Sequence, residues 1–206
     1  MTQARRERLG LFGGSFDPPH RAHLELARAA RDELALDAVL WIPAGDPWQK
    51  PGAITAAEHR TAMVERVIAG EPRFALERCE LNRSGPSYTL DTVRELRARH
   101  PQAEFFLVIG ADQYANLHTW HGWRELLGEV TLAVANRPGL LPPPADEVRR
   151  TPHAVVPLPM LDISATEIRA RIARGEPARS LVPDLVPDAV AGYIDQHSLY
   201  KGDNRS

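Results

Sequence analysis

The chain has 206 residues, of which 43% are hydrophobic and 25% charged, and its formal net charge is -2 at pH 7. This size fits one globular domain, and the small net charge excludes a basic field that would bind nucleic acid over the whole surface. Cys79 is the only cysteine, which excludes an internal disulfide and a multi-cysteine metal site and makes the cytoplasm the expected location. No apolar run is long enough for a membrane span or a signal peptide, so we expect a soluble protein without a membrane partner.

Short apolar runs alternate with longer segments of helical period, which is typical of βαβ units and a mainly parallel sheet. The predicted strands cover residues 8–12, 38–42, 74–79, 104–109, 131–135 and 154–157. We therefore predict an α/β fold of the Rossmann-like, doubly wound type, with six strands flanked by helices. Residues 8–160 would form this core, and residues 161–200 a small C-terminal helical part of the same domain, 1–206. Segments 44–54 and 137–152 contain the Gly and Pro residues typical of loops.

Local patterns place several helices between these strands. An apolar stripe follows the first strand and consists of Leu24, Leu26, Ala27, Ala30 and Leu34. The segment from Thr55 to Glu58 has the pattern of a capping box, which predicts that Thr55 caps a helix. The segment from Ser164 to Glu167 repeats the pattern, and Pro187 suits the first turn of a last helix.

The densest motif, Gly13-Gly-Ser-Phe-Asp-Pro-Pro-His20-Arg-Ala-His23, lies where the first strand passes into the first helix. Doubly wound sheets bind ligands at this point. Glycines allow the backbone amides of Gly13, Gly14 and Ser15 to approach a phosphate, and the helix start adds unpaired amides. His20 and His23 are spaced to lie on one helix face, so both imidazoles are expected to point at one anionic group.

Other uses of this segment are excluded or disfavoured, or stay open for a single feature. It matches neither G-x-G-x-x-G nor the P-loop, which excludes a dinucleotide-binding oxidoreductase motif and a P-loop NTPase. For either feature alone, a tight turn and a helix cap remain open alternatives. A zinc site is disfavoured, because the chain has one cysteine and no H-E-x-x-H. Asp17 is not assigned as a metal ligand, because it could equally fix the turn before Pro18.

The motif resembles the phosphate-binding signature of the nucleotidyltransferase superfamily, G-G-x-F-D-P-x-H-x-G-H, with Ala22 at the last glycine position. Residues 163–169 resemble its second signature, I-S-S-T-x-I-R. In that segment Ser164 suits a helix cap and Arg169 offers a forked cation for two phosphate oxygens, although an ordinary capped helix would read the same if it stood alone. The resemblance implies ATP contacts from Gly13, Gly14, Ser15, Phe16, His23, Gly110, Asp112, Ile163, Ser164, Thr166 and Arg169.

Further motifs, in order along residues 9–200, resemble the bacterial nicotinate mononucleotide adenylyltransferases. They are Ile42-Pro-Ala-Gly-Asp-Pro-Trp-Gln-Lys50, His59-Arg60 with Met63, Gly85-Pro-Ser-Tyr-Thr89 with Asp91 and Thr92, Ile109-Gly-Ala-Asp112, Trp120, Arg137-Pro-Gly139, and the ending Leu185-Val-Pro-Asp-Ala-Val-Ala-Gly-Tyr193 with Leu199-Tyr200. The resemblance implies that nicotinate mononucleotide is bound by Lys50, Ser87, Tyr88, Thr89, Trp120, His121 and Arg137. Trp120 would stack on the pyridine ring, and Thr89 with nearby amides would receive the carboxylate. His121 stands where the family often has tyrosine.

Structural roles remain open for several of these residues. Lys50 could be an ordinary surface lysine, Trp120 a core residue, and Thr89 or Asp112 a helix cap. The other tryptophans, Trp41, Trp48 and Trp123, are assigned to packing.

The resemblance implies that the phosphate of nicotinate mononucleotide attacks the α-phosphorus of ATP in line. This step releases pyrophosphate and forms nicotinate adenine dinucleotide, a precursor of NAD. His20, His23, Lys50 and Arg169 are the expected catalytic residues, and Mg²⁺ would arrive with ATP, without dedicated protein ligands. The partners expected are ATP and nicotinate mononucleotide, with no nucleic acid, and a homo-oligomer is left open. The rival hypotheses are a sibling transferase with another phosphorylated acceptor, a nucleotide sensor without turnover, and a class I synthetase fragment.

Overall fold

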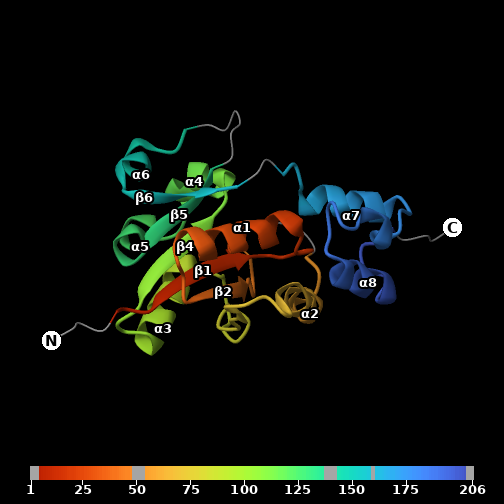
Figure 1. The fold of residues 1–206 in the computed structure, drawn as a ribbon, viewed down its shortest axis with the longest axis horizontal. Helices are drawn as coiled ribbons and strands as arrows, with labels where there is room; N and C mark the ends of the chain where they lie inside the picture. Colours follow the sequence, from red (N-terminus) through yellow and green to blue (C-terminus); the bar gives the residue numbers. More distant parts are fainter. Residues whose placement is uncertain (1–4, 48–53, 137–142, 159–160, 203–206) are drawn as a thin grey trace.

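The computed structural model describes residues 5–47, 54–136, 143–158 and 161–202 (Figure 1). Within these ranges, six strands form one sheet in the order β3-β2-β1-β4-β5-β6. They are β1 (Arg8–Gly14), β2 (Ala38–Pro43), β3 (Phe74–Leu76), β4 (Glu104–Ile109), β5 (Thr131–Asn136) and β6 (His153–Pro157). All pairs are parallel, and the order reverses between β1 and β4, which confirms the predicted doubly wound α/β fold.

Helices cover both faces of the sheet. They are α1 (Arg21–Glu33), α2 (Ala57–Ile68), α3 (Thr89–Arg99), α4 (Ala111–Asn116), α5 (Trp123–Glu129), α6 (Asp146–Arg150), α7 (Ala165–Ala173) and α8 (Asp188–Gln196), with 3-10 turns η1 (Leu117–Thr119) and η2 (Ala178–Leu181). Figure 1 shows α1 lying across one face and α7 and α8 together at the C-terminal end of the molecule. In the part of the chain that the structure describes, no helix has the length and apolar character needed to cross a bilayer.

Alternate side chains of β1 pack into two hydrophobic cores, one on each face of the sheet. Leu9 and Leu11 pack on one face with buried residues of α3 and α5, while Phe12 packs on the other with buried residues of α1, α2, α7 and α8. Side chains of a strand point alternately to the two faces, so a strand covered on both sides is apolar throughout. This explains why β1 reads as a continuous apolar run before its glycines.

Two predicted boundaries are wrong. The strand predicted over 74–79 ends at Leu76, because the N–H of Cys79 donates to Glu77 Oε1 at 2.9 Å and leaves the sheet. The predicted loop 137–152 contains α6, a helix of 5 residues. Its one buried residue, Val148, gives too little apolar pattern to reveal a helix in the sequence.

The predicted capping box at Thr55 is also wrong. Helix α2 has Ala56 at its N-cap. The backbone of Thr55 is engaged elsewhere: its N–H donates to Asp17 Oδ2 at 3.2 Å and its carbonyl accepts from Arg60 Nε at 2.8 Å. The cap at Ser164 is confirmed, since its Oγ accepts from the N–H of Glu167 at 3.1 Å.

Candidate active site

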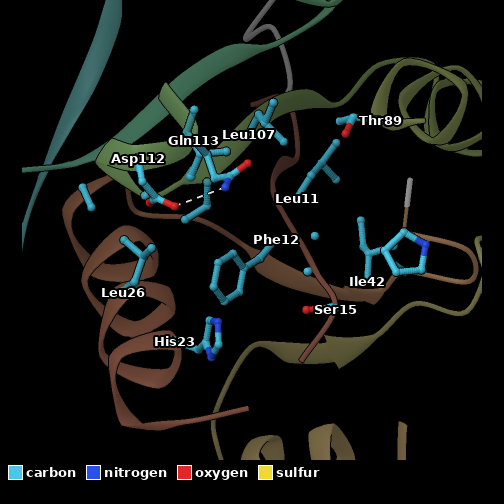
Figure 2. Close-up of a pocket in the computed structure, with 18 of the residues that line it drawn as sticks. Leu11, Phe12, Ser15, His23, Leu26, Ile42, Thr89, Leu107, Asp112 and Gln113 are labelled. Atoms are coloured by element: carbon cyan, nitrogen blue, oxygen red, sulfur yellow. Dashed lines mark hydrogen bonds between the residues drawn. The ribbon is translucent and has the colours of Figure 1, made fainter. Parts of the chain in front are cut away.

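A cavity of about 490 Å³ opens at the carboxyl ends of β1 and β4, where the strand order reverses. The N-terminal residues of α1, α3 and α7 all line it. The first amides of a helix lack partners within the helix, and the dipole makes that end positive. In Figure 2, His23 of α1, Thr89 of α3 and Asp112 of α4 lie around the same open space. The cavity is therefore suited to an anionic ligand, as the motif between β1 and α1 predicted.

His20 and His23 form a stacked pair in the cavity wall, with ring centroids 3.7 Å apart. His20 is the N-cap residue of α1, so only His23 lies within the helix. The N–H of His20 donates to His23 Nδ1 at 3.1 Å, which leaves Nε2 as the proton-bearing nitrogen of a neutral His23 ring. His23 therefore presents a ring N–H donor at the cavity wall.

The glycine-rich turn divides between the cavity and the core. Gly13, Gly14 and Ser15 line the cavity, whereas the side chain of Phe16 is 1% exposed and packs edge-on against Phe12. Phe16 also has a positive φ of 49°, which turns the chain sharply after the strand. The side chain of Phe16 thus anchors the turn, and only its backbone remains for a ligand.

The second motif lies on the same cavity. Ile163, Ser164 and Thr166 line it at the start of α7. Arg169 is not among the lining residues, since its guanidinium donates to the carbonyl of Asp17 at 2.6 Å and to Thr166 Oγ1 at 3.4 Å. Arg169 therefore joins the two motifs, which are 152 residues apart in the chain.

Aromatic side chains line the region beside the start of α3. Tyr88 stacks on His121 with ring centroids 4.3 Å apart, and Trp120 lines the same cavity. The Trp120 indole Nε1 is buried and has no hydrogen-bond partner among the described residues. Thr89 is the first residue of α3 and Tyr88 its N-cap, so the alternative that Thr89 is a cap is wrong. Lys50 and Arg137 lie outside the described residues.

Comparison with known proteins identifies the family. Residues 11–171 match the family model described as Cytidylyltransferase-like. The chain is 52% identical over 202 residues to a protein of Methylibium petroleiphilum named "Probable nicotinate-nucleotide adenylyltransferase", covering 97% of this chain and 95% of the relative. A protein of the same name from Bordetella petrii is 46% identical, with 95% and 100% covered. The chain belongs to the nicotinate-nucleotide adenylyltransferase family.

A solved structure agrees on the fold. The Plasmodium falciparum nicotinic acid mononucleotide adenylyltransferase complexed with NaAD superposes with a TM-score of 0.80 at 19% identity. The alignment covers 95% of this chain and 98% of that one. The resemblance to this adenylyltransferase family that the sequence motifs indicated is confirmed.

The structure of this family member also contains a buried polar network around Glu80, a residue that the sequence patterns did not single out. Glu80 is 7% exposed, lines the cavity and accepts the hydroxyl proton of Thr92 at 2.6 Å. Burial raises the pKa of the Glu80 carboxyl, while hydrogen bonds from Thr92 and Ser87 lower it. Ser87 Oγ in turn accepts the N–H groups of Gly45 and Asp46 at 3.0 and 3.2 Å. The Ser87 hydroxyl is thus committed to joining the turn after β2 to the start of α3.

One signal for Glu80 was present in the sequence. It is an acidic residue directly after the predicted strand 74–79, at the edge of the sheet where ligands bind.

Asp112 and its neighbour Gln113 also line the cavity. The N-cap of α4 is Gly110 and not Asp112, so the capping alternative for Asp112 is wrong. Among the residues that the structure describes, no group of three or more His, Cys, Asp or Glu side chains is arranged to hold a metal ion.

Proposed function

We propose that this chain transfers the AMP part of ATP to nicotinate mononucleotide, releasing pyrophosphate and forming nicotinate adenine dinucleotide. The observation that carries this proposal is the meeting of both nucleotide motifs and an aromatic subsite on one cavity. The names of the relatives and the NaAD complex of the structural neighbour support the same acceptor. The single cysteine, which is buried and unpaired, suits a reducing compartment such as the cytoplasm.

The ATP half of the site would use the helix starts. Backbone amides of the 13–16 turn and of the first turn of α7 would receive the polyphosphate, with Ile163, Ser164 and Thr166 along one side. Gly110 permits close approach of the nucleoside, and the Asp112 carboxylate would accept from ribose hydroxyls.

Arg169 is retained in the proposal as a phosphate ligand. A guanidinium carries five N–H donors in a planar fork, so its contacts with Asp17 and Thr166 do not exhaust it. The guanidinium would then bridge the carbonyl of Asp17 and a phosphate oxygen.

The acceptor half would use the aromatic subsite. Trp120 would stack on the pyridine ring, with Tyr88 and His121 alongside. Thr89 and the first amides of α3 would receive the carboxylate, because a carboxylate accepts from every donor that a helix start presents. Ser87 would act by holding the turn after β2 in place, and Lys50 and Arg137 stay predictions from the sequence.

Catalysis in this proposal rests on positioning and charge. The acceptor phosphate attacks the α-phosphorus of ATP in line, and no covalent enzyme intermediate is needed. His20 and His23 would donate to the oxygens on which negative charge builds. Mg²⁺ bound to the ATP phosphates would neutralise part of their charge. Asp17 does not fit as a ligand for this ion, because its two carboxylate oxygens already accept from Tyr200 and Thr55.

Pyrophosphate release with three candidate acceptors tests the proposal. The acceptors are nicotinate mononucleotide, nicotinamide mononucleotide and phosphopantetheine, each mixed with MgATP. We expect turnover with the nicotinate compound and at least about tenfold lower efficiency with the nicotinamide, whose NH₂ group leaves a donor of the site unpaired. Preference for phosphopantetheine would establish the sibling transferase, and no release with any acceptor would favour a nucleotide sensor.

A further inference from the structure

The Asp17 carboxylate lies behind the phosphate motif and is held from two distant parts of the chain. Its side chain is 5% exposed. Oδ1 accepts the hydroxyl proton of Tyr200 at 2.7 Å, across a separation of 183 residues, and Oδ2 accepts the N–H of Thr55 at 3.2 Å. The C-terminal segment and the residue before α2 therefore meet at one residue of the motif.

Two arginines hold backbone carbonyls of the same segment. Arg60, 1% exposed, donates to the carbonyls of Ser15 and Thr55 at 2.9 and 2.8 Å, and Arg169 donates to the carbonyl of Asp17 at 2.6 Å. The C=O and N–H of a trans peptide point in opposite directions. The bond to the Ser15 carbonyl therefore turns the next N–H, that of Phe16, away from Arg60. The two guanidinium groups outnumber the Asp17 carboxylate, so the cluster also adds positive charge behind the turn.

Tyr200 is suited to be a neutral donor in this cluster. Burial and the neighbouring Asp17 charge raise the pKa of its phenol above the ordinary value, so the hydroxyl keeps its proton. Its neighbour Leu199 packs against the hydrophobic core and its N–H donates to the carbonyl of Ile194. Leu199 is therefore anchored without the Tyr200 hydroxyl, which leaves that hydroxyl for a separate task.

We propose that Tyr200 is a positioning residue for ATP binding, which acts through Asp17 to hold residues 15–17 in the shape that receives phosphate. Arg60 completes the support by fixing the Ser15 carbonyl. This inference rests on the proposed function for the identity of the ligand. Tyr200 does not line the cavity, so its hydroxyl would affect the ligand only through Asp17.

The test is Tyr200→Phe, which removes one hydroxyl and keeps the ring. We expect the KM for ATP to rise roughly tenfold, the scale of a lost hydrogen bond to a charged group, with less than a twofold change in the KM for nicotinate mononucleotide. Tyr193→Phe is the matched control. Its hydroxyl lies 2.9 Å from His59 Nδ1, away from the motif, so both KM values should stay at the wild-type level.

A double-mutant cycle with Asp17→Ala, which removes the acceptor of the Tyr200 hydroxyl, tests the route. If Tyr200 acts through Asp17, the Tyr200→Phe change should have little further effect on the KM for ATP in the Asp17→Ala background. An unchanged KM for ATP in Tyr200→Phe, equal rises in both KM values, the same effect from Tyr193→Phe, or additive effects in the cycle would each overturn the proposal.

Calorimetry separates this proposal from the proposed function. ATP binding to wild-type protein and to Tyr200→Phe is measured without an acceptor, so the result does not depend on turnover. Weaker binding of ATP by the variant supports the positioning role even if nicotinate mononucleotide is not the acceptor. Equal affinity contradicts the role even if the adenylyl transfer is demonstrated.

Discussion

His23 combines two tasks that substitution can separate. Its Nδ1 accepts the N–H of His20 at the start of α1, and its ring lines the cavity, where Nε2–H would meet a phosphate. Asparagine places an acceptor near the position of Nδ1 but has no distal donor. Glutamine extends a donor towards the position of Nε2 but loses the short-range acceptor. His23→Asn and His23→Gln therefore remove one task each, and His23→Ala removes both.

The expected magnitudes differ between the variants. His23→Asn should lower kcat about 100- to 1,000-fold, the usual loss for one preorganised donor at developing charge, and leave the free energy of unfolding nearly unchanged. His23→Gln should retain more of kcat but lose about 1 kcal/mol of stability, the typical contribution of a helix cap. His23→Ala should show both losses. It also removes the edge-on ring contact with Phe16, whose centroid lies 5.3 Å away.

Two measurements decide the outcome. Pyrophosphate release at saturating ATP and nicotinate mononucleotide reports kcat, and urea unfolding reports stability. His23→Asn with at least half of the wild-type turnover would refute the role of Nε2. His23→Asn as unstable as His23→Ala would refute the argument for Nδ1 as the cap.

Three further predictions concern other residues of the site and core. Trp120→Ala should raise the KM for the mononucleotide about fivefold or more and leave the KM for ATP unchanged, since stacking contributes about 1 kcal/mol beyond burial. Trp120→Phe should retain most of the affinity. A normal mononucleotide KM in Trp120→Ala would show that Trp120 only packs in the protein. Burial raises the pKa of the Glu80 carboxyl above its ordinary value of 4.5, so the stability of the wild-type protein falls as the pH rises through that range and the group ionises. The stability of Glu80→Gln relative to wild type should therefore increase from pH 4 to pH 7. A constant difference would contradict the burial argument. Burial also raises the pKa of the Cys79 thiol from 9.0 to about 12. A thiol reagent at pH 8 should therefore modify Cys79 only in urea-unfolded protein. Rapid labelling of the native protein would contradict this, because it would show that the thiol is accessible.

Features that depend on neighbouring residues could be predicted from the sequence. The apolar runs of β1, β2 and β4 and the cap at Ser164 were predicted, because strand period and a cap hydrogen bond involve residues a few positions apart. The pairing of His20 with His23 is local for the same reason. The site's location followed from a fold rule, since the first βα turn of a doubly wound sheet lies where the strand order reverses.

Features that depend on packing were decided by the tertiary structure alone. Thr55 begins a complete local capping pattern, yet its N–H donates to the carboxylate of Asp17. The two residues are 38 positions apart and meet only because the chain before α2 lies against the motif. Arg169 and Tyr200 reach the same Asp17 from 152 and 183 residues away. The local sequence carries no pattern for such pairs, because their distance depends on how the helices pack on the sheet. The sequence by itself determined the six strands, the motifs and the family, while the three-dimensional fold decided which groups face the ligand and which hold the others in place.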